Sequence, residues 1–260
     1  MRCAVADRLL PIADGFWNVR GSFKLGGHVD IGTQTSLVRL HDRSFALLDA
    51  YTLRGEVKER IFGLTDGGRA ISSVLHLHPF HTLHVEAVAA LLPHAVHYGS
   101  ARHRARAPGV RWSELSIEHP ELHARFAEDF DFMVPRGVPF IAKDQRLHFS
   151  SVLAFHKHSR TLHVDDTLTF TPVPLVGGLG FHLTLPWVLE RRPGAVADFR
   201  AWAEQLAVRC RSVDHIVTAH ARPLPRLSSE GPGLEAPVRR ALQRTELTLR
   251  LHERRWGRPA

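Results

Sequence analysis

The chain has 260 residues, of which 44% are hydrophobic and 23% are charged, the balance of an ordinary globular protein in water. Its formal net charge is +8, it has no apolar stretch long enough to span a bilayer, and its first residues lack the apolar segment of a signal peptide. Its two cysteines, Cys3 and Cys210, are too few for a disulfide framework. Composition therefore excludes a membrane-embedded or disulfide-rich secreted protein, and it predicts a cytoplasmic location.

The order of strand and helix signals predicts an α/β architecture. Runs of β-branched and aromatic residues predict strands at residues 17–25, 29–40, 44–51, 71–75, 95–98, 138–141, 146–155, 161–164 and 216–218. Apolar residues at helical spacing predict helices at residues 82–92 and 195–210. We also expect a short helix at residues 56–64, helical turns near residues 121–130 and a final helix at residues 235–256. Residues 173–184 are glycine-rich, and we expect a loop or lid there.

The positive charge is concentrated near the C-terminal end, where residues 236–260 hold seven arginines against Glu246 and Glu253. A basic helix can bind nucleic acid or an anionic surface, but motif-free basic helices are more often solvated faces. No linker or repeat divides the chain. We therefore expect one domain over residues 1–230, with residues 231–260 forming a basic helix that packs on or extends it.

The most informative motif follows the apolar run at residues 71–75 and reads His76-Leu77-His78-Pro79-Phe80-His81. Imidazole is the commonest metal ligand in proteins. Because residues i and i+2 of a strand point to the same side, we expect His76 and His78 to share one ion. His81, beyond Pro79, could face a second ion or a substrate, or could instead cap the helix that follows.

Three further metal-capable residues, His148, Asp166 and His220, lie within or just after predicted strands. If those strands end at one edge of a sheet, all three side chains could converge with the histidine run. Each also has a purely structural interpretation. A buried histidine can bond to the backbone, and an aspartate such as Asp166 can form an Asx turn.

The order of these residues resembles the metallo-β-lactamase superfamily, which carries a His-x-His-x-Asp-His run, then a His, an Asp and a final His. The matching positions are, in chain order, His76, His78, His81, His148, Asp166 and His220. Asp49 resembles the early strand-end aspartate that supports the ligands in that family. The resemblance covers about residues 16–223.

The resemblance implies a four-layer αββα sandwich with a metal site at one edge. One site would use His76, His78 and His148. The other would use His81 and His220, with Asp166 shared between the ions. The expected cofactor is zinc, as one or two ions, and the implied activity is hydrolysis of a small-molecule substrate by metal-activated water. Asp166 would act as general base if one ion is bound, and His220 would hold a second ion or orient the water. We expect neither a nucleic acid nor a membrane as partner.

Phe80 departs from the family pattern, because it stands where the family has a ligating aspartate and a phenyl ring cannot bind a metal ion. Asp165, His84 or His103 could complete a second site. Iron instead of zinc, in a redox enzyme of the same fold, and a non-catalytic binding protein with a degenerate site remain alternatives. Residues 101–135 and 175–186 are expected to face the substrate. Within the first of these segments Arg102 could contact an anion, although a simple turn is favoured there.

Overall fold

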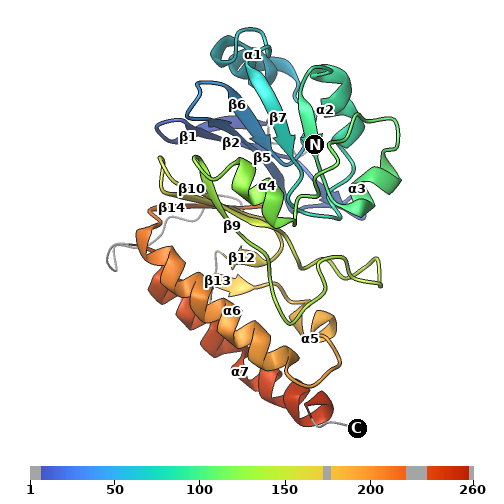
Figure 1. The fold of residues 1–260 in the computed structure, drawn as a ribbon, viewed down its shortest axis with the longest axis vertical. Coiled ribbons are helices and arrows are strands. Elements are labelled where there is room, and N and C mark those ends of the chain that lie inside the picture. The colour runs from blue at the N-terminus through green and yellow to red at the C-terminus, as the bar shows by residue number, and fades with distance from the viewer. Residues whose placement is uncertain (1–6, 172–176, 221–232, 258–260) are drawn as a thin grey trace.

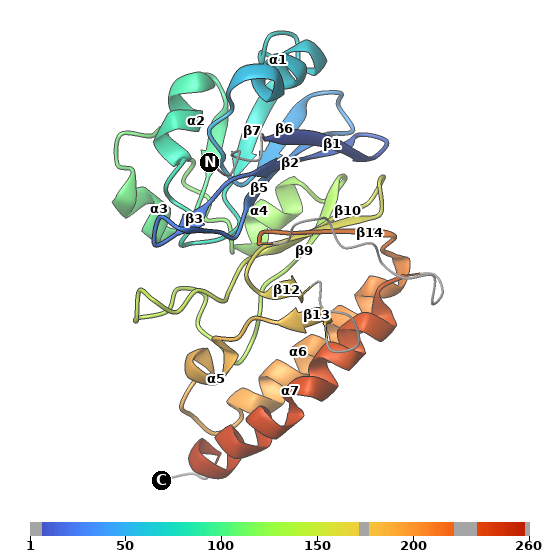
Figure 2. The ribbon, with the colours of Figure 1, turned by 180° about the vertical axis from the view of Figure 1, so that it is seen from behind.

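Two β-sheets lie between two layers of helices in this computed structural model, which describes residues 7–171, 177–220 and 233–257 (Figure 1). Helices α1 (Gly55–Leu64) and α2 (Val85–Leu91) cover the outer side of the first sheet, and α6 (Ala195–Arg209) and α7 (Glu235–Trp256) cover the second. The same order of layers is visible from behind (Figure 2). Three short helices lie in the connections, namely α3 (Ala101–Arg106), α4 (Pro120–Arg125) and α5 (Leu185–Val188), and a 3₁₀ turn spans Cys210–Ser212.

The first sheet has the strand order β1-β2-β5-β6-β7-β8. Its strands are β1 (Arg8–Ala13), β2 (Phe16–Gly21), β5 (Thr33–Arg39), β6 (Phe45–Leu48), β7 (Ile71–Leu75) and β8 (Val96–Tyr98). Pairing is antiparallel from β1 to β6 and parallel from β6 through β7 to β8, with Leu48 opposite Leu75 and Leu75 opposite Tyr98. A small hairpin, β3 (Lys24–Leu25) and β4 (Val29–Asp30), extends from the same region.

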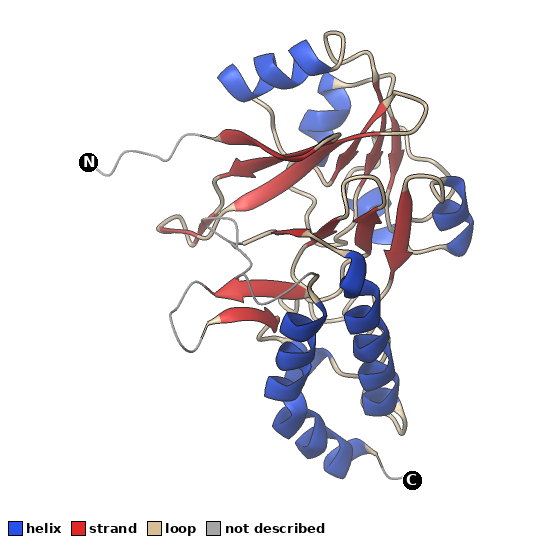
Figure 3. Cartoon of the chain, turned by 90° about the vertical axis from the view of Figure 1, so that its left-hand side faces the viewer, coloured by secondary structure: helices blue, strands red, loops and turns tan. Residues whose placement is uncertain are grey.

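The second sheet has the order β14-β11-β10-β9, formed by β14 (His215–Thr218), β11 (Thr161–Val164), β10 (Leu153–His156) and β9 (Phe130–Met133). Strands β11 and β14 run parallel, so their carboxyl ends reach the same edge. A separate hairpin, β12 (Leu168–Thr171) and β13 (Gly178–Phe181), lies toward α7. Helices α6 and α7 run side by side below these strands (Figure 3).

Alternation along the strands divides the apolar residues among three cores, one for each interface between layers. Leu47 packs with residues of α1 and α2, whereas its neighbour Leu48 packs between the two sheets. In the second sheet Ala154 faces the first sheet, and Phe155 faces α6 and α7. Three cores between four layers confirm the expected αββα sandwich.

Several expected elements differ from the structure. Residues 138–141 form bends instead of a strand, and the expected strand at 146–155 is reduced to Leu153–His156. The chain turns at Gly137, where φ is +75° and any Cβ would lie 2.1 Å from the carbonyl oxygen of Ala195 on α6. The segment therefore lies against α6 instead of pairing with a neighbouring strand. Part of the expected loop at 173–184 forms β13, and residues 172–176 lie outside the described residues.

The predicted C-terminal helix at 235–256 is confirmed, and it packs against α6 and β13. Its buried residues are Val238, Ala241, Leu242 and Leu249, which belong to the core of the second sheet. Within the described part of the chain, every helix is too short or too polar to cross a membrane.

Candidate metal centre

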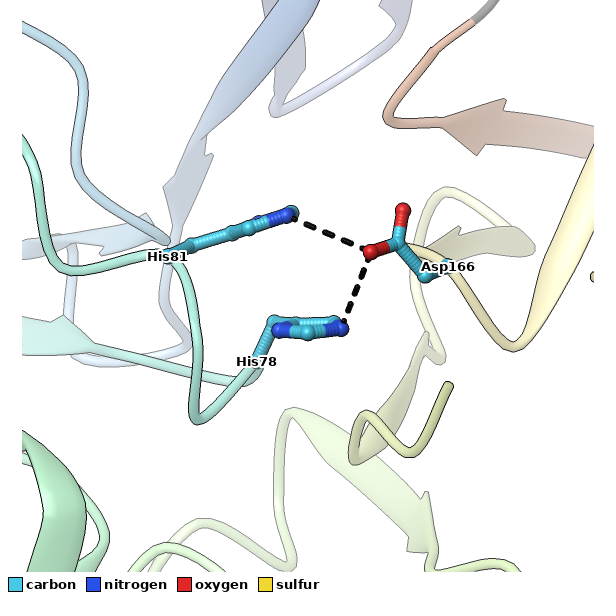
Figure 4. Close-up of side chains that lie close together, drawn as sticks. All are labelled: His78, His81 and Asp166. Carbon is cyan, nitrogen blue, oxygen red and sulfur yellow. Dashed lines mark ion pairs between the residues drawn. The ribbon is translucent and has the colours of Figure 1, made fainter. Parts of the chain in front are cut away.

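The predicted site residues lie where strands of both sheets end. His78 and His81 follow β7, Asp166 follows β11, and His220 follows β14. The loop that precedes β10 brings His148 to the same edge. Figure 4 shows His78 and His81 on one turn, both facing Asp166.

One carboxylate is the centre of this arrangement. Oδ2 of Asp166 lies 3.2 Å from His78 Nε2, 3.6 Å from His81 Nε2 and 3.9 Å from His148 Nδ1. Its Oδ1 lies 3.0 Å from His220 Nε2. We call these five residues the Asp166 cluster. Asp166 and His78 are buried, whereas His148 is 41% exposed and marks the open side.

The tautomers that the backbone imposes on two of the imidazoles suit metal binding. His220 Nδ1 donates to the Gly32 carbonyl at 2.8 Å, and His148 Nε2 donates to the Gln145 carbonyl at 3.1 Å. A ligating histidine usually donates its second ring N–H in this way, which leaves a lone pair on the nitrogen that binds the ion. In both residues that nitrogen faces an Asp166 carboxylate oxygen. The nitrogen lone pair and the carboxylate oxygen repel each other at these distances unless a cation or a proton lies between them.

The distances in the cluster also fit an ion. Zinc–nitrogen bonds of about 2.0–2.1 Å place tetrahedral ligands roughly 3.4 Å apart, and the two shortest contacts of Asp166 Oδ2 are 3.2 Å and 3.6 Å. His78 Nε2 and Asp166 Oδ1 are buried, and beyond the ion-pair contacts given above they make no hydrogen bond among the described residues. His78 Nδ1 accepts from the Phe80 N–H at 3.1 Å, so an ion at Nε2 has to displace a proton and shift this turn slightly.

The electrostatics of the cluster keep Asp166 ionised. Burial alone would raise the pKa of Asp166, but the imidazoles of His78, His220 and His81 lower it well below its usual value. Burial opposes a charge on His81, yet Asp166 and Asp165 outweigh burial and raise the pKa of His81 to about 9. Burial and the nearby His81 lower the pKa of His78 to about 4. Neutral His78 beside a carboxylate is the form in which both residues bind a metal ion.

Solved structures of similar fold align with nearly the whole chain. A metallo-β-lactamase from Erythrobacter litoralis with β-mercaptoethanol in the active site aligns with a TM-score of 0.59 and 14% identity, covering 95% of this chain and 96% of that one. The FIM-1 metallo-β-lactamase of Pseudomonas aeruginosa in its mono-zinc form gives 0.55 and 14%, over 96% of both chains. A Pontibacter korlensis metallo-β-lactamase gives 0.56 and 12%, over 94% and 99%.

The chain has the metallo-β-lactamase fold. At sequence identities of 12–14%, the similarity shows only that the fold is shared. No family model and no curated protein matches the sequence. Within this metallo-β-lactamase fold, the chemistry of the site depends on the chain's own residues.

His76 was expected to share an ion with His78, but the structure places it outside the Asp166 cluster. Its Nε2 lies 3.0 Å from His97 Nδ1, and its ring packs against Trp112 and His103, so it does not share a site with His78. The i/i+2 rule fails here because β7 ends at Leu75. Beyond that point the chain turns, and His78 faces the cluster although His76 faces α3.

A second buried group joins Asp49 and Asp165, which the sequence analysis named, to His163, which it did not. His163 Nε2 lies 3.1 Å from Asp49 Oδ2 and 3.8 Å from Asp165 Oδ1, and all three residues are buried. Ser36 and Gln34 on β5 complete the network through His163 Nδ1, at 2.9 Å, and Asp165 Oδ1, at 3.1 Å. Burial and the neighbouring Asp49 raise the pKa of Asp165 to about 6. The signal was the position of His163 between Leu162 and Val164, which points it away from their core and toward the first sheet.

These ligand atoms of Asp49, His163 and Asp165 are close enough to hold an ion, as are those of His78, His81 and Asp166. The other candidates for completing a second site lie elsewhere. His84 Nδ1 contacts Thr52 Oγ1 at 2.8 Å, and His103 Nδ1 accepts from the Ser100 N–H at 3.1 Å.

Proposed function

We propose that the protein is a metal-dependent hydrolase whose main ion, zinc, binds in the Asp166 cluster. The observation that carries the proposal is the set of four imidazole nitrogens gathered around one buried carboxylate, with His220 and His148 fixed in the ligand tautomer by backbone carbonyls. The metallo-β-lactamase fold supports it, since one similar structure is a mono-zinc form.

The position of each residue in the Asp166 cluster indicates its role. His78, His81 and His220 would hold the ion, and three protein ligands would leave its fourth position open for a water. The ion would bring the pKa of that water near 7 and polarise the bond under attack. Asp166, kept ionised by its neighbours, accepts the proton of the attacking water if one ion is present. His148, on the open side, borders the path of a small-molecule substrate.

Metal content per chain, measured by elemental analysis on protein without a histidine tag, tests this proposal. We expect about one zinc in the wild type and less than about a tenth of that in two variants. His220→Gln loses a ligand atom, and Asp166→Asn loses the negative charge that faces the ion. His123→Gln is the matched control, since His123 also donates to a backbone carbonyl, that of Ile117 at 3.0 Å, but lies outside the cluster. Full metal content in His220→Gln would overturn the assignment.

Iron-dependent redox chemistry is a second candidate. His78, His81 and Asp166 form a two-histidine, one-carboxylate set, which is also the ligand set of many non-haem iron enzymes. Iron found in place of zinc by the same analysis would favour this function. We further propose a cytoplasmic location, supported by the buried free thiol of Cys210.

A further inference from the structure

We infer that Arg102 binds an anionic group of the substrate beside the Asp166 cluster, and that Phe80 holds its guanidinium there. The inference rests on the proposed function and adds a substrate class to it. The class is a compound that carries a carboxylate or phosphate close to the bond that is hydrolysed. Both groups are oxyanions that a guanidinium can bind through two parallel N–H donors.

Phe80 links Arg102 to the cluster. Its ring stacks on the ring of His148, with centroids 4.6 Å apart and planes 25° apart, and it is only 8% exposed. The Cζ atom of Arg102 lies 4.5 Å from the centroid of the same ring. His148 in turn borders Asp166, so two rings connect the guanidinium to the centre of the cluster on its open side.

Arg102 lacks the partners that fix other arginines of this chain. No ion pair joins it to a carboxylate among the described residues, and its buried Nε has no hydrogen-bond partner there. Arg104, two residues along α3, donates instead to the Glu114 carbonyl at 2.9 Å. Burial and the nearby Arg106 lower the pKa of Arg102, which would favour an oxyanion beside it. A partly buried, unpaired cation next to a metal site is therefore available to a ligand.

The position of Phe80 in the histidine run explains why such a cation matters. A phenyl ring at this place cannot ligate, so it cannot help to hold a second positive ion beside the first. It can hold a guanidinium over its face by a cation–π contact. The site would then keep a second positive charge as a fixed side chain.

Binding of inorganic phosphate to the zinc-loaded full chain, measured by calorimetry, tests Arg102 without any turnover. We expect Arg102→Met to raise the Kd for phosphate by about tenfold or more. Arg102→Lys should raise it by about threefold, because lysine keeps the charge but lacks the two parallel N–H donors of the guanidinium. Phe80→Leu should weaken binding about threefold, since it keeps apolar volume but removes the ring. Arg60→Met, exposed on α1 at the outer side of the first sheet, is the control and should leave the Kd unchanged.

Metal content of every variant is read separately, so the two proposals can fail separately. Equal zinc in Arg102→Met and the wild type, with a phosphate Kd within about twofold, would overturn the role of Arg102 and leave the metal site standing. A wild-type chain that binds no phosphate would overturn it as well. If the wild type holds no ion, the proposed function fails, whereas phosphate binding that still depends on Arg102 would support the anion site alone. Circular dichroism confirms that each variant is folded.

Discussion

Asp49 fixes the turn on which the histidines of the site stand. It has a φ of +61°, a left-handed conformation that aspartate tolerates better than most residues. Its Oδ1 accepts from the N–H groups of Leu77 at 2.8 Å and His78 at 3.3 Å, and its Oδ2 lies 3.1 Å from His163 Nε2. One carboxylate therefore holds the backbone of the run and joins it to the second sheet.

Asp49→Asn should lower zinc affinity by about 10- to 100-fold, the usual cost of losing a residue that orients a ligand. The amide keeps the shape of the side chain but replaces one acceptor with a donor, so either the run or His163 loses its partner. Competition against a chelating dye measures the affinity. Asp129→Asn is the control, since Asp129 also accepts a backbone N–H, that of His41 at 2.7 Å, far from the cluster. Equal affinities in the two variants would contradict this role.

The same turn shows what the sequence could and could not predict about the site. Asp166 and His220 were predictable because each follows a short apolar strand, and parallel strands end at one edge. The orientation of His76 was not, because it depends on where β7 stops and on the hydrogen bond that Leu77 N–H donates to Asp49, 28 residues away. His163 was missed because its partners are distant in sequence: Ser36 and Gln34 lie on β5, and Asp49 follows β6. The alternation with Leu162 and Val164 indicates the side to which His163 points, but not the residues that it contacts.

At the scale of elements, α7 is a structural part of the fold, and its charges are largely used within it. Arg200 on α6 lies 2.9 Å from Glu246 and 3.0 Å from Glu253. Arg250 pairs with Glu246 along the helix at 3.0 Å. Helix α7 was predicted from end to end because its apolar spacing is local. The strand expected at 138–141 was not formed, because its packing against α6 decides its shape.

Leu249→Ala should destabilise the protein by about 2–5 kcal/mol, because it opens a cavity in the core of the second sheet. Leu249 is fully buried, whereas Leu247 on the same helix is 70% exposed. Leu247→Ala should change the free energy of unfolding by less than about 0.5 kcal/mol. Urea unfolding followed by circular dichroism compares the two. Equal stabilities would mean that α7 is not part of the core.

At the scale of the whole molecule, the four layers bury neutral imidazoles far from the metal site. His156, at the end of β10, is 1% exposed and packs against the rings of Phe16 and Phe130. Its Nδ1 lies 2.7 Å from Ser159 Oγ. Burial lowers the pKa of His156 to about 4, although the nearby Asp129 acts in the opposite direction.

This depressed pKa makes the fold sensitive to acid. The unfolded chain takes up a proton on His156 near pH 6.5, whereas the folded chain resists it until about pH 4. The stability that the neutral imidazole contributes is therefore complete above pH 6.5 and falls as the pH drops toward 4, by about 2 kcal/mol between pH 7 and pH 5. In His156→Gln this part of the pH dependence should disappear.

Urea midpoints measured from pH 7.5 to pH 4.5 on metal-free protein separate this effect from metal loss. The quantity to compare is the slope of stability against pH, because His156→Gln also removes packing and lowers stability at every pH. His94→Gln, at an exposed position, should retain the wild-type slope. An unchanged slope in His156→Gln would show that the acid sensitivity comes from other buried groups, such as His97 and His103, whose pKa values burial lowers to about 4 and about 3.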